Sequence, residues 1–90
     1  MKVGEIYLMK FSNVYYIIKI LEIVPDEDEP IYYSVNYEYI DYSTKINFGI
    51  GFQYLNALRS FIIKPLNRKV WYKAARECCN GGRWCLSYNW

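Results

Sequence analysis

The chain has 90 residues, of which 53% are hydrophobic and 20% aromatic, and its formal net charge is +2. A chain of this length fits one small domain, 1–90, and its apolar content is well above that of disordered segments. We therefore expect a globular fold and exclude a multidomain enzyme. The chain contains no His, the side chain most often used for proton transfer at neutral pH and the commonest metal ligand.

The N-terminal segment 1–11 lacks the continuous apolar stretch and small-residue cleavage site of a signal peptide. No apolar run approaches the ~20 residues needed to span a bilayer. The three cysteines, Cys78, Cys79 and Cys85, form an odd set near the C-terminus, which is a poor framework for a secreted disulfide scaffold. These features predict a cytoplasmic protein with reduced thiols and no membrane contact, located in the host cytoplasm if the protein is viral. Ile, Asn, Lys and Tyr account for 36 of the 90 residues. This bias is typical of an AT-rich gene from a bacterium, archaeon, phage or plasmid.

A strand is predicted over 2–11, and the Ser12-Asn13 pair that follows has turn chemistry. The segment 14–24 is rich in Val, Ile and Tyr and predicts a second strand. Lys19 and Glu22 are three residues apart, so in a regular strand these two charged side chains would point to opposite faces. One face therefore cannot stay buried along the whole strand without a bulge between these two residues. We therefore expect a bent second strand.

The segment 25–30 has Pro at both ends and four consecutive carboxylates, which predict a solvent-exposed loop: Asp26, Glu27, Asp28 and Glu29. The clearest period of two in the chain follows over 31–39 and predicts a third strand. Its alternation places Tyr33, Tyr37 and Tyr39 on the core side and Tyr32 on the opposite face.

A short fourth strand is predicted over 46–52, where two glycines permit tight curvature or close backbone approach. The segment 53–60 has apolar residues at helical spacing but is too short for an independent helix, so we expect one or two helical turns. The segment 61–64 predicts a fifth strand that stops at Pro65.

A helix is predicted over 70–79, because its apolar residues line one face: Val70, Trp71, Ala74, Ala75 and Cys78. Asn80-Gly81 would end this helix. The alternative is a hairpin turning across 80–82 that pairs 77–79 with 83–85, since Asn-Gly is also a strong hairpin signal.

Five short strands, a bent second strand and a helical turn before the fifth form an order of elements that resembles the SH3-like barrels, the group that includes Tudor and KOW modules. The resemblance covers 3–65 and implies a mainly β, small, curved five-stranded barrel. It leaves 66–90 as a basic, cysteine-containing C-terminal appendage. Such barrels bind peptides, nucleic acids or other proteins, so the resemblance implies binding without naming a partner.

No catalytic, metal or cofactor site is predicted. No His is present to activate a cysteine, and three cysteines give a zinc ion no fourth soft ligand. The acidic loop lacks the alternating spacing of a calcium loop, and Gly49-Ile50-Gly51 lacks the lysine and length of a phosphate-binding loop. We expect Cys78 to fill core space, while Cys79 or Cys85 could form a bridge under oxidation.

Charge divides the chain into two halves. Residues 1–45 carry four basic and eight acidic side chains, giving −4, and residues 46–90 carry seven basic side chains and one acidic, giving +6. Eighteen aromatic residues are too many for the interior of so small a barrel, so some must face outward. The sequence therefore predicts two candidate binding surfaces. The acidic and aromatic one comprises Asp26, Glu27, Asp28, Glu29, Tyr32 and Tyr42. The basic and aromatic one comprises Arg59, Lys64, Arg68, Lys69, Lys73, Arg76, Arg83, Trp84 and Trp90.

Three functions remain open from the sequence. The first is a non-catalytic protein, of phage or mobile-element origin, that inhibits a host defence or nucleic-acid-processing complex by covering its surface. The second is a small nucleic-acid-binding barrel, in which cations contact phosphates and aromatic rings stack on bases. The third is a structural subunit that pairs with itself.

Overall fold

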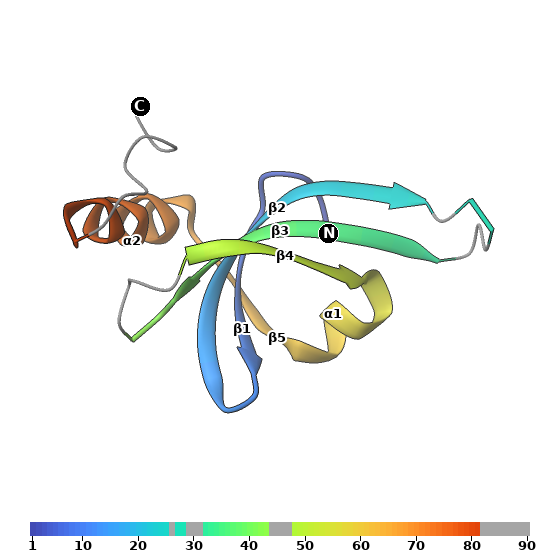
Figure 1. Ribbon diagram of the computed structural model, residues 1–90, viewed down its shortest axis with the longest axis horizontal. Helices are drawn as coiled ribbons and strands as arrows, with labels where there is room; N and C mark the ends of the chain where they lie inside the picture. The colour runs from blue at the N-terminus through green and yellow to red at the C-terminus, as the bar shows by residue number, and fades with distance from the viewer. Residues whose placement is uncertain (26, 29–31, 44–47, 82–90) are drawn as a thin grey trace.

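A computed structural model describes residues 1–25, 27–28, 32–43 and 48–81. Five antiparallel strands form one sheet in the order β4-β3-β2-β1-β5, accompanied by two short helices (Figure 1). The predicted mainly β fold with a helix before the fifth strand is confirmed, although the sheet is not closed into a barrel. The elements are β1 (Ile6–Phe11), β2 (Val14–Pro25), β3 (Tyr33–Asp41), β4 (Phe48–Tyr54), α1 (Leu55–Phe61), β5 (Ile62–Leu66) and α2 (Arg68–Gly81).

The turn between β1 and β2 has the predicted position. Ser12 and Asn13 both have positive φ, 52° and 63°. Two successive residues of this kind form the two-residue turn whose twist matches that of the flanking strands. The start of β1 differs from the prediction, since the strand begins at Ile6 rather than at Lys2. The preceding residues form a turn instead, in which the Glu5 N–H donates to the Lys2 carbonyl at 3.2 Å.

The predicted bulge in β2 is confirmed. Ile20 pairs with Tyr37 and Glu22 pairs with Asn36, so Leu21 is an extra residue without a partner position in β3. This insertion resets the alternation of β2. Lys19 and Glu22 can therefore share one face of the sheet although three positions separate them.

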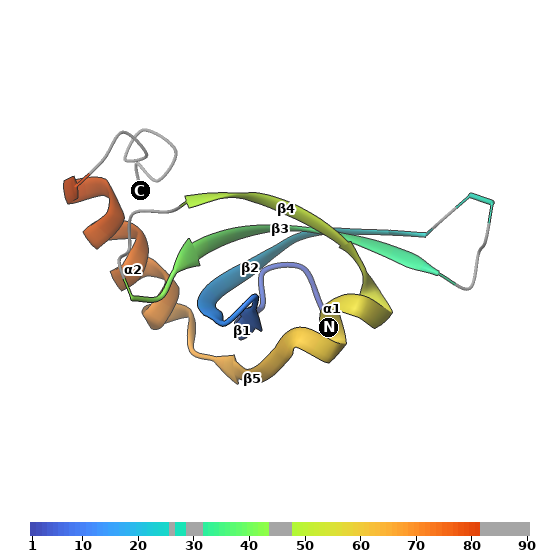
Figure 2. The same cartoon turned by 60° about the horizontal axis from the view of Figure 1, so that its bottom comes forward.

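The sheet has a hydrophobic core on each face. The face that we call inner carries Ile18, Ile20 and Val35, which pack with Leu58 of α1. The opposite, outer face carries Ile6, Ile17 and Ile40, which pack with Trp71, Ala74 and Ala75 of α2. Ile17 and Ile18 are adjacent in β2 and both fully buried, because successive strand residues point to opposite faces and both faces are covered there. Figure 2 shows the curved sheet arching over α1, with α2 at one end of the sheet.

Helix α2 confirms the predicted helix, and the hairpin alternative is wrong for 77–79, which are helical. The helix starts two residues earlier than predicted because Asn67 caps it. The Asn67 side-chain oxygen accepts a hydrogen bond from the Lys69 N–H at 2.9 Å. Its backbone carbonyl accepts another from the Val70 N–H at 3.0 Å. Asn is among the preferred residues at this position, since it satisfies N–H groups that the helix leaves unpaired.

Two further expectations are corrected. Pro65 does not end the fifth strand but lies within β5, opposite Tyr7 of β1. An edge strand tolerates proline, because alternate N–H groups there have no neighbour to bind. Tyr33 shares the inner face with Val35 and Tyr37, as its alternation predicts, but it is exposed rather than packed in the core. It pairs with Pro25 at the far end of the β2–β3 hairpin, beyond Ser34, where the pairing of β3 with β4 ends.

Candidate functional site

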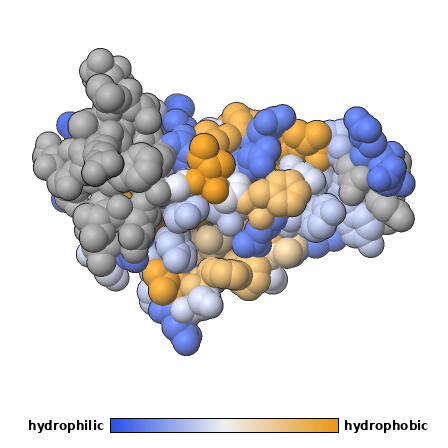
Figure 3. Space-filling view, in the orientation of Figure 1, coloured by the Kyte–Doolittle hydropathy of each residue, from blue (hydrophilic) through white to orange (hydrophobic). Residues whose placement is uncertain are grey.

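Strand β4 carries a row of exposed apolar side chains on the outer face. Ile50 is 70% exposed, Phe52 58% and Tyr54 49%. Alternate residues of a strand share one face, so these three side chains stand side by side. The Tyr54 ring lies 6.0 Å from the Phe52 ring and 6.3 Å from the ring of Tyr32, which precedes β3. We call these four residues the β4 row. Hydrophobic side chains gather over the strands in the middle of this face (Figure 3).

The two glycines of β4 explain why its larger side chains face outward. A Cβ atom on Gly49 would lie 2.5 Å from the Tyr39 hydroxyl, and one on Gly51 would lie 2.6 Å from Cζ of Tyr37. The two tyrosine rings therefore lie across β4 on the inner face, where only glycine leaves them room. This confirms the close approach predicted from the glycines. Ile50 between them, with Phe52 and Tyr54 in the same alternation, is left on the outer face, and sequence reasoning missed this consequence.

The predicted acidic and aromatic surface is divided by the structure. Glu27 and Asp28 are exposed at the tip of the β2–β3 hairpin, and Tyr32 directly precedes β3. Tyr42 is exposed just after the other end of β3. Nine strand residues separate the two tyrosines, which is about 30 Å of extended chain. Tyr32 and Tyr42 therefore do not form one surface. Asp26 and Glu29 lie outside the described residues.

The predicted basic residues are only partly brought together. The apolar residues of α2 face the sheet. Four of the predicted basic residues are exposed on this helix: Arg68, Lys69, Lys73 and Arg76. Arg59 and Lys64 are exposed on α1 and β5. Arg83, Trp84 and Trp90 lie outside the described residues, as does Cys85. Helix α2 and the tip of the β2–β3 hairpin lie at opposite ends of the molecule, whose longest dimension is 42 Å (Figures 1 and 2). Ionic screening acts over about 8 Å at physiological salt, so the charges at one end do not neutralise those at the other.

A cavity of about 210 Å³ opens on the inner face among tyrosine rings. The Tyr16 and Tyr39 rings meet edge to face at 5.4 Å. Nε2 of Gln53 donates a hydrogen bond to the Tyr37 hydroxyl at 3.2 Å, while the buried Oε1 of Gln53 has no hydrogen-bond partner among the described residues. Burial raises the pKa of Tyr37, and the hydrogen bond from Gln53 opposes this only in part. The Tyr37 hydroxyl therefore stays neutral at physiological pH and supplies no base.

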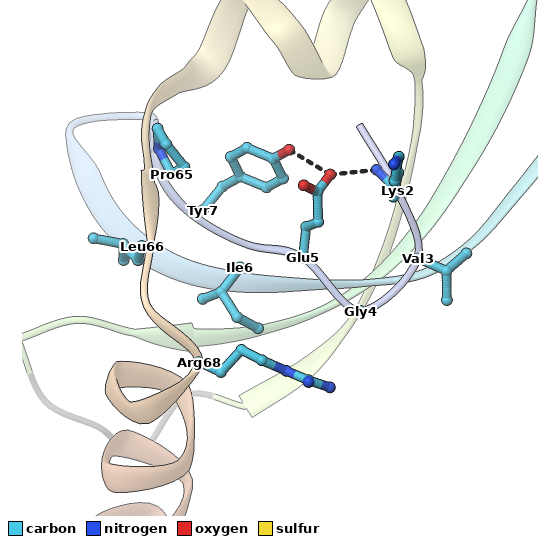
Figure 4. Close-up of a pocket in the computed structure, with 9 residues that line it drawn as sticks. All are labelled: Lys2, Val3, Gly4, Glu5, Ile6, Tyr7, Pro65, Leu66 and Arg68. Carbon is cyan, nitrogen blue, oxygen red and sulfur yellow. Dashed lines mark hydrogen bonds between the residues drawn. The ribbon is translucent and has the colours of Figure 1, made fainter.

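A second pocket, of about 330 Å³, lies beside the N-terminal turn and is lined in part by Arg68 (Figure 4). Here the Tyr7 hydroxyl donates to the Glu5 carboxylate at 2.8 Å, and the backbone N–H of Lys2 donates to the same oxygen. The hydrogen bond from Tyr7, followed by that from Lys2, lowers the pKa of Glu5. Burial, and then the bond to Glu5, raises the pKa of Tyr7 to about 12. Both pKa values move away from neutrality, so neither group is suited to proton transfer near pH 7.

Within the described ranges, no three His, Cys, Asp or Glu side chains converge in a way that could hold a metal ion. None of the described helices has the length and apolar character required to cross a bilayer. The absence of catalysis, of a metal and of a cofactor stays a prediction from the sequence, as does the cytoplasmic location.

The fold and its surfaces define a small domain with an open, five-stranded antiparallel sheet and an apolar row beside one edge. The chain matches no protein-family model, no curated protein and no solved structure.

Proposed function

We propose that this chain is a non-catalytic binding protein that engages another protein through the β4 row. The observation that carries the proposal is the run of three exposed apolar side chains on one edge strand: Ile50, Phe52 and Tyr54. Single exposed apolar residues are common on soluble proteins, but neighbouring ones that form a patch mark interaction sites. Aromatic side chains are well suited to such a patch, because they bury a large area and lose few rotatable bonds.

A protein that binds through an apolar patch such as the β4 row acts by covering part of its partner's surface. This mode of action suits the inhibitor hypothesis drawn from the sequence, in which a phage or mobile-element protein covers a host complex. The β4 row supports protein binding in general. The inhibitory role and the identity of the complex remain predictions.

Site-specific photo-cross-linking tests the proposal. A photoreactive amino acid replaces Ile50 in one chain and, in a matched chain, Ile63, which is 50% exposed on the opposite edge strand β5. Both chains are irradiated in a lysate of cells that carry the gene. We expect one protein to be cross-linked from position 50 and not from position 63, and excess unlabelled chain to compete. Equal labelling from both positions, or none from position 50, would contradict the proposal.

Nucleic-acid binding is the second candidate, and the four exposed cations of α2 favour it. Arg68, Lys69, Lys73 and Arg76 lie within nine residues of one helix. If they contact phosphates, affinity for oligonucleotides falls steeply as salt rises, because counterions are released on binding. A titration with single- and double-stranded oligonucleotides at two salt concentrations decides this. A salt-independent response, or no binding by the wild-type chain, excludes the function. A Lys69→Ala and Lys73→Ala double variant should bind several-fold more weakly.

A further inference from the structure

We infer that the edge of β4 to which no described strand pairs accepts an extended, basic segment of a partner protein, which pairs with β4 and continues the sheet as a sixth strand. The inference rests on the proposed function, since it specifies what the β4 row binds. It also goes further, because it names the backbone geometry and the charge of the partner segment.

The two edges of the sheet differ in the protection they carry. Strand β5 contains Lys64 and Pro65, and both residue types are common on edge strands because they hinder pairing with another chain. Strand β4 is the other edge, and its sequence, FGIGFQY, contains no charged residue and no proline. Unprotected apolar edges are sites where a further strand can add.

The backbone of β4 is regular enough to template such a strand. It pairs with β3 in seven consecutive registered positions, from Ser34 opposite Tyr54 to Ile40 opposite Phe48, without a register shift. The pairing of β5 with β1, in contrast, shifts between Leu8 and Met9. In an antiparallel pair the N–H and C=O groups of alternate residues point away from the neighbouring strand. Every second residue of β4 therefore presents both groups to the open edge.

An added strand would have neighbours on both faces of β4, apolar side chains on the outer face and tyrosine rings on the inner face. On the outer face its side chains would lie beside Ile50, Phe52 and Tyr54. On the inner face its neighbours would be Gln53 and two glycines, across which the hydroxyl ends of Tyr39 and Tyr37 reach β4. No side chain of these glycines blocks the approach. The rings also offer a polarisable surface to an aliphatic or cationic stem.

The charge around β4 selects a basic partner. Strands β2, β3 and β4, with the described part of the β2–β3 turn, carry five acidic side chains: Glu22, Glu27, Asp28, Glu38 and Asp41. Asp41 is buried and accepts a hydrogen bond from the Ser43 N–H, so the other four contribute to the surface. Their one basic residue is Lys19, which lies directly opposite Glu38 in the register of β2 and β3 and whose Nζ lies 5.9 Å from the centre of the Tyr72 ring of α2. The exposed carboxylates Glu22, Glu27 and Asp28 keep the charge of this part of the sheet negative. A basic strand on this edge is attracted to these carboxylates, which raises the association rate and disfavours acidic competitors.

The same charge distribution argues against a second copy as the occupant. A symmetric pairing of β4 with β4 places the same surface on both sides of the twofold axis. It would therefore bring two acidic faces together and leave both basic helices remote. A different protein with cationic side chains in an extended segment meets this surface better.

Defined peptides test the inference directly. The probes are a seven-residue peptide alternating Lys and Val, a matched peptide alternating Glu and Val, and a Lys–Val peptide with proline at its centre. Affinity is measured by fluorescence anisotropy at low and physiological salt, and amide hydrogen exchange is followed along β4. We expect the Lys–Val peptide to bind about tenfold or more tightly than either control, a difference of about 1.4 kcal/mol. Exchange should slow at alternate β4 amides. Equal affinity of the Lys–Val and Glu–Val peptides, or unchanged β4 exchange, overturns the inference.

Two variants locate the site. Phe52→Lys places a cation on the open edge and should weaken Lys–Val binding about tenfold, whereas Ile63→Lys on β5 should leave it unchanged. Ile50→Lys, at the most exposed position of the β4 row, replaces Phe52→Lys if the latter does not fold. Equal binding by all folded variants overturns the inference. Concentration-dependent self-association that Phe52→Lys abolishes does so too, since it identifies a second copy as the occupant. If cross-linking from position 50 succeeds while the peptides fail, the proposed function stands and this inference falls.

Discussion

Replacing Trp71 by alanine tests whether α2 is an integral part of the fold. The Trp71 side chain is fully buried between α2 and the outer face, where it contacts the core formed with Ile17 and Ile40. Burying roughly 150–250 Å² of aromatic surface is worth about 4–6 kcal/mol at about 25 cal/mol per Å². The structure around the site relaxes only in part, and measured losses for Trp→Ala in protein cores are about 3–5 kcal/mol. A domain of this size has a total stability of about 5–15 kcal/mol, so Trp71→Ala should remove a large share of it.

Urea unfolding followed by far-UV circular dichroism measures this loss. We expect the free energy of unfolding to fall by about 3–5 kcal/mol in Trp71→Ala. The matched control is Lys73→Ala, an exposed position on the same helix, which should change stability by less than about 0.5 kcal/mol. A loss below about 1 kcal/mol in Trp71→Ala would refute the reasoning, because α2 would then contribute little to the folded state.

Three further predictions concern the inner face and the N-terminal turn. Gly51→Ala should lower stability by about 1–3 kcal/mol in chemical unfolding, because the new Cβ displaces the buried Tyr37 ring. The loss should shrink in a Tyr37→Leu background, and an equal loss in both backgrounds would show that the ring is not the obstacle. Gln53→Met removes the unpartnered Oε1 together with one hydrogen bond, so thermal unfolding should show a stability within about 1 kcal/mol of wild type. A loss above about 2 kcal/mol would mean that the amide has partners. The pKa of Tyr7 is raised to about 12 by burial and by Glu5, so its proton is held more tightly in the folded than in the unfolded chain. Its contribution to stability is complete below about pH 10 and is lost as the pH rises toward 12, and Tyr7→Phe should flatten this part of the pH–stability curve relative to wild type. Parallel curves for the two chains would contradict that assignment.

Local sequence patterns determine much of this fold. The opposite parity of Lys19 and Glu22 required a bulge, and the structure places one at Leu21. The Ser12-Asn13 turn also follows from chemistry confined to a few neighbouring residues. The start of α2 was predicted two residues late, although Asn67 is a common capping residue and was the available signal.

The docking of α2 on the outer face was harder to predict from the sequence. Its apolar stripe was evident, but a stripe does not identify the surface that it covers. The adjacent Ile17 and Ile18 held the missing information. Two successive large apolar residues in a strand indicate burial on both faces, and the alternating pattern elsewhere in the sheet concealed this. The sequence therefore predicts 66–90 as an appendage, whereas in the structure the described part of this segment completes the second core.

The β4 row was missed for a related reason. The glycines of β4 indicate a close approach to its backbone, but the sequence pattern alone does not assign Ile50 and Phe52 to a face. Once Tyr37 and Tyr39 occupy the inner side of β4, the period of two leaves Ile50 and Phe52 on the outer side. Spatial neighbours such as Tyr32 could not be added without the register of β3 and β4.

The outer face of the sheet carries two apolar regions with different outcomes. At one end, Ile6, Ile17 and Ile40 are covered by α2, whose Trp71 is fully buried against them. At β4, the described part of the chain leaves the β4 row exposed. The free energy gained by removing apolar surface from water is roughly proportional to the area buried. This gain is realised where α2 covers the sheet, and at the β4 row it is available to a binding partner. The edge of β4, which contains no charged residue and no proline, adds directional hydrogen bonds to this apolar contribution. The nearby carboxylates add a preference for positive charge. An extended basic segment satisfies all three requirements at once, whereas a symmetric second copy satisfies the first two and opposes the third.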